Sequence, residues 1–191
     1  MEMLSPDRKN QLIDVLKKVG VVKFGQFVLK DGSTSSVYVD LRILPNFPEE
    51  FQISVKIAAE YLRKQGIADR IDGLVAPPLA GIPLGVALAI ELKKEFYLAR
   101  MEAKEHGTRK LIEGEISNKR ILIVDDVITS GGSKVPILNA VRDHGAVTDS
   151  LFVFVNRVHS RESLIELEKE LNVTVKGLLS LDDLINASTK Q

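Results

Sequence analysis

The sequence predicts an α/β fold with a mostly parallel central sheet flanked by helices, and three observations lead to that prediction. Short apolar runs alternate with helical segments from about residue 71 onward, as in repeated βα units. The run Ile121–Val124 is continuously β-branched or aliphatic, which is typical of a strand buried on both faces. A length of 191 residues suits one medium domain with its own core. We therefore expect a single domain over residues 1–191.

The first elements are expected to be a helix, a small hairpin and a second helix. Residues 5–20 begin with an N-cap serine and a first-turn proline and end with a stop glycine, the signals of an amphipathic helix. Residues 27–30 and 37–40 are then expected as two short strands joined by a turn-prone connection. Asn46 and Pro48 open the second helix, which is expected to run to about residue 64.

Beyond the second helix, strands and helices alternate in the order expected of a parallel sheet with crossover helices. The expected strands lie near 71–75, 96–100, 120–124, 147–155 and 173–178. The expected helices lie near 81–94, 133–143, 161–170 and 181–187. We accordingly separate a small amino-terminal part, at about 20–45, from a core at about 46–191.

The composition excludes several classes of protein. The chain has no cysteine, so disulfides and thiolate metal sites are excluded. Its 26 basic and 26 acidic residues balance, which argues against the basic surface of most nucleic-acid-binding proteins. The longest apolar stretch, residues 73–92, is interrupted by prolines and is not expected to span a membrane, and no segment has the pattern of a signal peptide. We expect a cytoplasmic protein with no nucleic-acid or membrane partner.

The most informative segment is Ile121–Ser133, with the sequence ILIVDDVITSGGS. Asp125 and Asp126 are expected at the carboxyl end of the apolar strand, where ligands bind in open α/β sheets. Adjacent carboxylates can accept hydrogen bonds from the vicinal hydroxyls of a sugar. Residues 129–133 include two glycines, whose backbone N–H groups can turn toward an anion at the start of the next helix. The segment therefore predicts a site for a phosphorylated sugar.

An ordinary strand-to-helix turn with Ser133 as the N-cap is the alternative interpretation of this segment. A cap needs only one side chain, whereas the segment gathers several anion-binding groups and has no lysine in the Walker pattern. We therefore favour the phosphate site.

Four other features are ambiguous from the residues alone. Residues 76–83 follow the first core strand and form either a rigid proline turn or a second ligand loop at the same sheet edge. The charged segment 100–114 lacks periodicity and is either a solvated loop or a mobile loop that delivers positive charge to a polyphosphate. Lys30 lies beside a turn, as surface lysines often do. Arg157 closes a later strand, where a guanidinium is usually a surface charge but can also hold a carboxylate through two parallel hydrogen bonds.

The segment Ile121–Ser133 closely resembles the binding motif for phosphoribosyl pyrophosphate (PRPP) in type I phosphoribosyltransferases. The pattern Arg-x-Glu-Ala-Lys-x-His-Gly at 100–107 resembles the catalytic loop of the orotate phosphoribosyltransferases, and residues 23–42 resemble the hood of that family. The resemblance covers nearly the whole chain. It implies the type I phosphoribosyltransferase fold with a small amino-terminal hood.

The same resemblance implies an activity. PRPP and orotate would be the substrates, and transfer of ribose 5-phosphate to N1 of orotate would give orotidine 5′-monophosphate and pyrophosphate in de novo pyrimidine biosynthesis. Mg²⁺ would be the cofactor. The family also implies a homodimer, because its catalytic loop reaches across to the active site of the neighbouring subunit.

Carried over position by position, the resemblance assigns roles to particular residues. The catalytic residues would be Lys104, His106, Asp125 and Asp126. The residues that contact PRPP would be Arg100, Lys104, His106, Asp125, Asp126, Val127, Ile128, Thr129, Ser130, Gly131, Gly132 and Ser133. The residues that contact orotate would be Lys30, Tyr38, Val39, Thr129 and Arg157. Magnesium would be held indirectly through PRPP, with Asp125 and Asp126 as the candidates for protein contacts.

Two positions depart from the family pattern. Met101 stands where the family commonly has a second lysine that touches the phosphates, which predicts weaker PRPP binding unless Arg109 or Lys110 substitutes. Ala80 stands where some members carry a lysine, so a pyrophosphate contact there would come from the main chain, which in this family is often strained or cis. Two other functions stay open: transfer to a purine or another pyrimidine, and a PRPP-sensing regulator that has lost catalysis.

Overall fold

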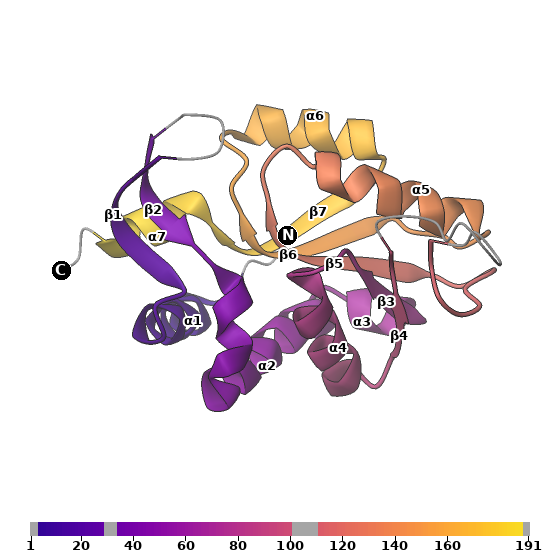
Figure 1. Ribbon diagram of the computed structural model, residues 1–191, viewed down its shortest axis with the longest axis horizontal. Coiled ribbons are helices and arrows are strands. Elements are labelled where there is room, and N and C mark those ends of the chain that lie inside the picture. The colour runs from indigo at the N-terminus through magenta and orange to yellow at the C-terminus, as the bar shows by residue number, and fades with distance from the viewer. Residues whose placement is uncertain (1–3, 29–33, 101–110, 189–191) are drawn as a thin grey trace.

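A computed structural model describes residues 4–28, 34–100 and 111–188 and has a five-stranded parallel sheet as its centre (Figure 1). The strand order is β4-β3-β5-β6-β7. The strands are β3 (Gly73–Ala76), β4 (Glu95–Leu98), β5 (Ile121–Ile128), β6 (Ser150–Asn156) and β7 (Thr174–Ser180). The architecture confirms the predicted α/β class with a parallel sheet.

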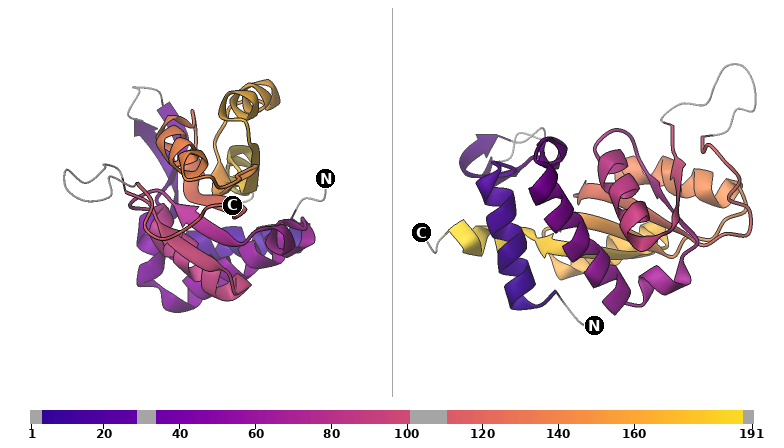
Figure 2. Two further views of the ribbon diagram at one scale, coloured as in Figure 1. Left: turned by 90° about the vertical axis from the view of Figure 1, so that its right-hand side faces the viewer. Right: turned by 90° about the horizontal axis from the view of Figure 1, so that it is seen from below.

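Helices cover both faces of this sheet. The helices on one face are α1 (Pro6–Lys18), α2 (Pro48–Lys64), α3 (Ile67–Arg70) and α4 (Gly81–Leu92), and Figure 2 shows α1, α2 and α4 side by side beneath the strands. The opposite face carries α5 (Val135–Asp143) and α6 (Arg161–Leu171). The last helix, α7 (Leu181–Ser188), follows β7 and lies beside the amino-terminal hairpin.

The side chains of β5 and β6 alternate between two apolar cores. Leu122, Val124 and Phe152 belong to the core under α1, α2 and α4, whereas Ile123 and Val153 belong to the core under α5 and α6. Successive residues of a strand point to opposite faces, so a strand between two helical layers must be apolar at every position. This is the physical basis of the unbroken apolar run that predicted β5.

The amino-terminal hairpin consists of β1 (Val22–Val28) and β2 (Thr34–Val39), which pair antiparallel. The first strand begins at Val22 rather than at residue 27, because Val22 pairs with Val39 across the hairpin. The residues expected in the turn lie outside the described ranges. A 3-10 helix, η1 (Leu41–Asn46), then precedes α2, so Asn46 ends one helix and Pro48 begins the next.

Two core strands differ from their predicted bounds by more than two residues at one end. β5 continues through Ile128 instead of ending at residue 124, since Val127 pairs with Val155 of β6. β6 begins at Ser150 rather than at 147, because Val147 makes only an isolated bridge with Arg120.

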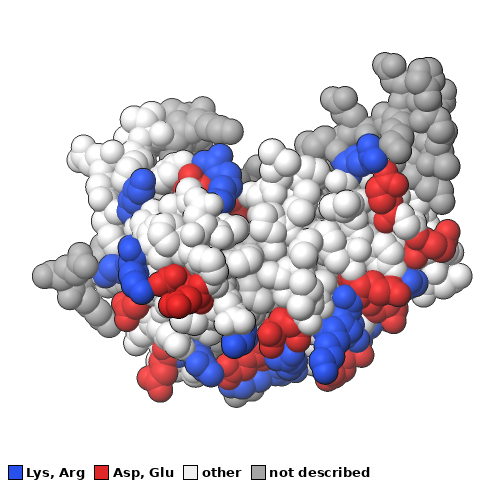
Figure 3. All heavy atoms as spheres, turned by 60° about the horizontal axis from the view of Figure 1, so that its bottom comes forward, with Lys and Arg blue, Asp and Glu red and all other residues white. Residues whose placement is uncertain are grey.

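The surface shows charges of both signs on the face drawn in Figure 3, where basic and acidic side chains are interspersed along the lower edge. Within the described ranges, no helix combines the length and the apolar character needed to cross a membrane.

Candidate active site

The acidic pair lies in the last residues of β5 rather than beyond the strand. Asp125 is buried and Asp126 is half-buried. The Asp125 Oδ1 atom accepts a hydrogen bond from the backbone N–H of Asp126 at 2.9 Å, and Asp126 Oδ1 accepts one from the N–H of Val127 at 2.7 Å. Both carboxylates are thus held by the backbone that carries them.

The environment of the pair favours the neutral form of Asp126. Burial raises the pKa of Asp126 to about 6, and the negative charge of Asp125 beside it acts in the same direction. The hydrogen bond from Val127 and the charge of Lys134 oppose these effects. Asp126 therefore changes its charge at mildly acidic pH.

Lys134, at the end of the short 3-10 helix η2 (Gly132–Lys134), contacts the acidic pair directly. Its ammonium group forms an ion pair with the carboxylate of Asp125 and donates to the carbonyl of Val127 at 3.1 Å and to the hydroxyl of Ser133 at 2.9 Å. The sequence motif does not identify this residue. The only available signal was a lysine directly after Gly-Gly-Ser, at a position followed by the apolar face of a helix.

The glycine loop after β5 presents polar groups to solvent. Thr129, Ser130 and Ser133 are exposed, and Gly131 has a φ of +74°, a conformation that favours glycine. A side chain at Gly131 would also come within 2.7 Å of Leu167 on α6. η2 begins after Gly131 with no side-chain cap, so the alternative interpretation of Ser133 as an N-cap is wrong.

The proline loop between β3 and α4 lies next to the acidic pair. A Cβ atom on Gly81 would be 3.0 Å from Asp125 Oδ1 and 2.9 Å from the carbonyl oxygen of Val124. The peptide bond between Pro78 and Leu79 is cis. The two loops therefore meet at one edge of the sheet, as their positions after neighbouring parallel strands predict.

Arg157 links the end of β6 to the hairpin. Its backbone N–H donates to the carbonyl of Ile128 at 2.9 Å, and its Nη2 atom donates to the hydroxyl of Ser35 at 3.4 Å. The ring of Tyr38 packs against Phe27 at a centroid distance of 5.5 Å. Val39 packs against the core, so the side chains of Tyr38 and Val39 lie on opposite faces of β2.

Arg100 stands where the charged segment leaves β4. Its backbone N–H donates to the carbonyl of Leu111 at 2.8 Å, and its guanidinium forms an ion pair with Glu113. The two described flanks of the segment therefore contact each other. Three predicted site residues, Lys30, Lys104 and His106, lie outside the described ranges.

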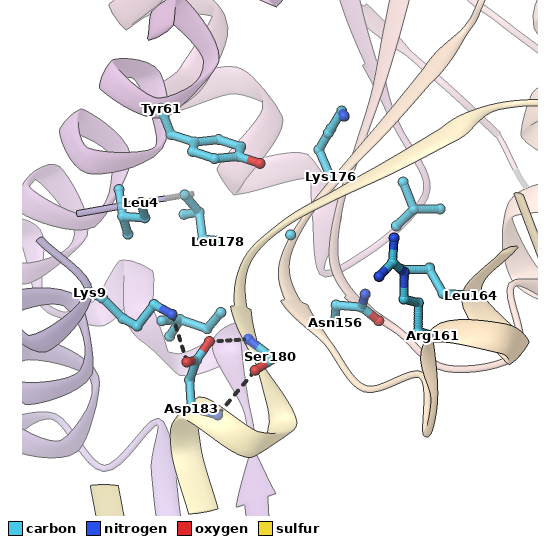
Figure 4. Close-up of a pocket in the computed structure, with 13 residues that line it drawn as sticks. Leu4, Lys9, Tyr61, Asn156, Arg161, Leu164, Lys176, Leu178, Ser180 and Asp183 are labelled. Carbon is cyan, nitrogen blue, oxygen red and sulfur yellow. Dashed lines mark hydrogen bonds and ion pairs between the residues drawn. The ribbon is translucent and has the colours of Figure 1, made fainter. Parts of the chain in front are cut away.

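Two pockets flank this region. One, of about 410 Å³, lies between the glycine loop and α6 and is lined by Thr129, Ser130 and Arg157 among others. The other, of about 540 Å³, runs along β7, and Figure 4 shows Tyr61 directed into it above the ion pair of Lys9 with Asp183. Among the described residues, none of the predicted site residues lines the β7 pocket, whereas three of them line the pocket beside the glycine loop.

The carboxylates of the candidate site suit a magnesium ion that binds together with a substrate. Among the described residues, no group of three histidine, aspartate or glutamate side chains could hold a metal. The Asp125 carboxylate is already paired with Lys134, which leaves Asp126 as the better placed protein ligand. Mg²⁺ usually keeps several waters and binds through one or two carboxylates together with substrate phosphates, and this arrangement fits that pattern.

The fold and the site define a class. An acidic pair, a glycine loop and a guanidinium at the carboxyl edge of a parallel sheet are typical of an α/β protein that binds a sugar phosphate. Comparison with known proteins agrees, since the model of the phosphoribosyl transferase domain matches residues 43–182.

Named relatives narrow the class. The chain is 38% identical to an orotate phosphoribosyltransferase of Pyrococcus abyssi over 161 residues, 84% of this chain and 87% of the relative. It is 34% identical to the orotate phosphoribosyltransferase of Methanocaldococcus jannaschii, covering 91% and 98% of the two chains. The crystal structure of orotate phosphoribosyltransferase from Aeropyrum pernix superposes with a TM-score of 0.80 at 29% identity, over 94% of this chain and 99% of that one. The chain belongs to the orotate phosphoribosyltransferase family of the phosphoribosyltransferases.

Proposed function

We propose that this chain transfers the ribose 5-phosphate group of PRPP to N1 of orotate, giving orotidine 5′-monophosphate and pyrophosphate, in the de novo synthesis of pyrimidine nucleotides. The observation that carries the proposal is the convergence of three groups at one sheet edge. These groups are the acidic pair of β5, the glycine loop after it, and Arg157 beside the hairpin. They suit the sugar, the phosphate and the carboxylate of the two substrates.

Each group has a separate task in this reaction. Asp125 and Asp126 accept hydrogen bonds from the ribose hydroxyls, and the backbone of residues 129–133 surrounds the 5′-phosphate. Arg157, with Thr129, holds the carboxylate of orotate and so directs N1 toward the anomeric carbon. The orotate anion needs little base catalysis, so positioning and charge stabilisation account for most of the rate.

Charge builds on the pyrophosphate as it leaves. We propose that Lys104 and His106, with Arg100 at the start of the segment, bring positive charge to that group and exclude water when the loop closes. Bound Mg²⁺ would further neutralise the pyrophosphate oxygens. Asp126 would hold the ion through water, because Asp125 is paired with Lys134.

We further propose a homodimer that shares this loop, in a cytoplasmic enzyme. Val86 and Ile90 lie one turn apart on α4 and expose apolar side chains, Ile90 by 74%. Leu98 of the edge strand β4 is also exposed. Exposed apolar side chains of this size favour a protein contact, and a partner docked on α4 and β4 would lie next to the segment that starts at Arg100.

The test is the fall in orotate absorbance after PRPP and Mg²⁺ are added, with a Lys104→Ala variant and a metal-free sample as controls. We expect a fall that requires both Lys104 and the metal. Absence of any fall with the native chain would overturn the assignment to orotate. A screen with uracil, adenine, hypoxanthine and xanthine then separates transfer to another base from PRPP binding without turnover.

A further inference from the structure

The buried ammonium group of Lys134 connects three parts of the candidate PRPP site through hydrogen bonds and an ion pair. Its side chain is 8% exposed and that of its partner Asp125 is 7% exposed, so the ion pair is nearly shielded from water. An ammonium group has three N–H donors and no acceptor. All three donors have partners here, namely the Asp125 carboxylate, the Val127 carbonyl and the Ser133 hydroxyl.

The ion pair between Lys134 and Asp125 reduces the net negative charge at the end of β5. Two adjacent carboxylates would repel each other and the polyanionic PRPP if both were ionised without a cation nearby. Lys134 offsets one of these charges from a buried position. The carboxylates can therefore accept ribose hydroxyls at a smaller electrostatic cost to phosphate binding.

In the hydrogen bond between Lys134 and Ser133, only one of the two groups can be the donor. Because the ammonium group can only donate, the Ser133 oxygen must accept in the hydrogen bond of 2.9 Å. The hydroxyl hydrogen of Ser133 is then left to donate elsewhere. Ser133 is exposed in the loop that faces the predicted 5′-phosphate, so its hydrogen is available to a phosphate oxygen.

We propose that Lys134 is a positioning residue for the phosphorylated sugar, which fixes the Asp125 carboxylate, ties the glycine loop to β5 and orients the Ser133 hydroxyl toward the 5′-phosphate. This inference rests on the proposed function, since it assigns PRPP to this loop. It adds a residue to which the sequence motif gives no role.

The first test is Lys134→Met, which keeps an unbranched side chain of nearly the same length and removes its charge and donors. Lys176→Met is the matched control, because Lys176 is a half-buried lysine that lines the β7 pocket, away from the described residues predicted to bind substrate. We expect the KM for PRPP and the Kd for ribose 5-phosphate to rise about 10- to 100-fold in Lys134→Met. The KM for orotate at saturating PRPP should change less than about twofold, and Lys176→Met should leave all three constants unchanged.

A second comparison tests the role of Ser133 and guards against misfolding. If Lys134 acts partly through that hydroxyl, Lys134→Met should weaken ribose 5-phosphate binding less in a Ser133→Ala background than in the native chain. Should Lys134→Met alone fail to fold, the variant Asp125→Asn with Lys134→Met removes both buried charges. Its affinity for ribose 5-phosphate should be lower than that of Asp125→Asn alone, because the contacts of Lys134 with Val127 and Ser133 are lost as well. Equal affinities of these two variants would overturn the proposal.

The outcomes separate this inference from the proposed function. A native chain that turns over orotate, with a Lys134→Met variant of unchanged PRPP and ribose 5-phosphate affinity, overturns the role of Lys134 and leaves the enzyme assignment intact. Equal losses for PRPP and orotate would indicate a general structural role and would also overturn it. A native chain that binds neither PRPP nor ribose 5-phosphate refutes the proposed function itself.

Discussion

Arg157 at the end of β6 donates a hydrogen bond from Nη2 to the hydroxyl of Ser35 on β2, across 3.4 Å. The two residues are 122 positions apart in the chain, so the contact joins the hairpin to the sheet edge that carries the acidic pair. A guanidinium has five N–H donors. The hydrogen bond to Ser35 therefore leaves donors for a substrate carboxylate.

The first prediction concerns orotate recognition. Arg157→Ala should lower kcat/KM for orotate about 10- to 100-fold, because a charge-assisted contact to the carboxylate is lost. The KM for PRPP should change little. Arg161→Ala is the control, since Arg161 is an exposed arginine at the start of α6 that lines the β7 pocket. Steady-state kinetics with each substrate varied in turn provides the measurement, and equal effects of the two substitutions would contradict the role of Arg157.

The second prediction concerns pH and stability. Burial and the charge of Asp125 raise the pKa of Asp126 from 3.8 to about 6 in the folded chain. Between these values the folded state binds a proton that the unfolded state has released, so this group makes the free energy of unfolding fall as pH rises. Above about pH 7 both states are ionised and the loss is complete. The side chain is only half-buried, so we expect a total loss of about 1–3 kcal/mol.

Asp126→Asn removes that titration while keeping an oxygen for the Val127 N–H. Urea unfolding at pH 5, 6 and 7.5 should show the variant gaining stability relative to the native chain as pH rises, by about 0.5–1.5 kcal/mol across the series. A difference between the two proteins that is constant over this range would show that Asp126 does not titrate there.

The order of strands and helices could be predicted because their periodicity is local. The apolar run before Asp125 identified β5, and the glycine-rich segment after it identified the loop. The end of β5 could not be predicted, because Val127 joins the strand only by pairing with Val155 of β6. For the same reason, the start of β1 depends on the pairing of Val22 with Val39.

Residues of the candidate site that form a recognisable motif could be named from the sequence, whereas roles that depend on contacts made by folding could not. The acidic pair and the glycine loop belong to one segment, so their residues could be named in advance. In the sequence, Lys134 resembles an ordinary surface lysine. In the folded chain, the turn after β5 brings its ammonium group to Asp125. The hydrogen-bond partner of Arg157 could not be predicted either, because Ser35 belongs to the hairpin, which is distant in the sequence.

The third prediction separates two glycines of the site. Gly81→Ala would place a Cβ atom 2.9 Å from the carbonyl of Val124 and 3.0 Å from Asp125, so either the start of α4 or the acidic pair must move. We expect a loss of about 1–3 kcal/mol in the free energy of unfolding, together with lower activity. A Cβ atom on Gly132 would have no neighbouring atom within 4 Å, so Gly132→Ala should leave stability nearly unchanged. It should weaken PRPP binding at the loop. Urea unfolding and PRPP titration of both variants test this, and similar effects on stability would refute it.

The fourth prediction concerns Met101, which lies outside the described residues. The family commonly has a phosphate-contacting lysine at this position, so Met101→Lys should lower the KM for PRPP. A gain of one charge-assisted contact corresponds to about 1.5–3 kcal/mol, or roughly 10- to 100-fold. An unchanged KM would mean that Arg109 or Lys110 already supplies the contact, or that the position does not reach PRPP.

The last prediction tests whether two subunits share one site. If Lys104 acts in the neighbouring subunit, a Lys104→Ala chain and an Asp125→Asn, Asp126→Asn chain are each inactive alone, but a mixed dimer has one composite site with all three residues intact. Equal amounts that exchange at random should recover about a quarter of native activity, because half of the dimers are mixed and each has one of two sites. Adding Ile90→Lys to both chains places a charge on the exposed apolar surface of α4 and should abolish the recovery by preventing association. Activity that never returns on mixing, despite dimers seen by sedimentation, would show that each subunit completes its own site.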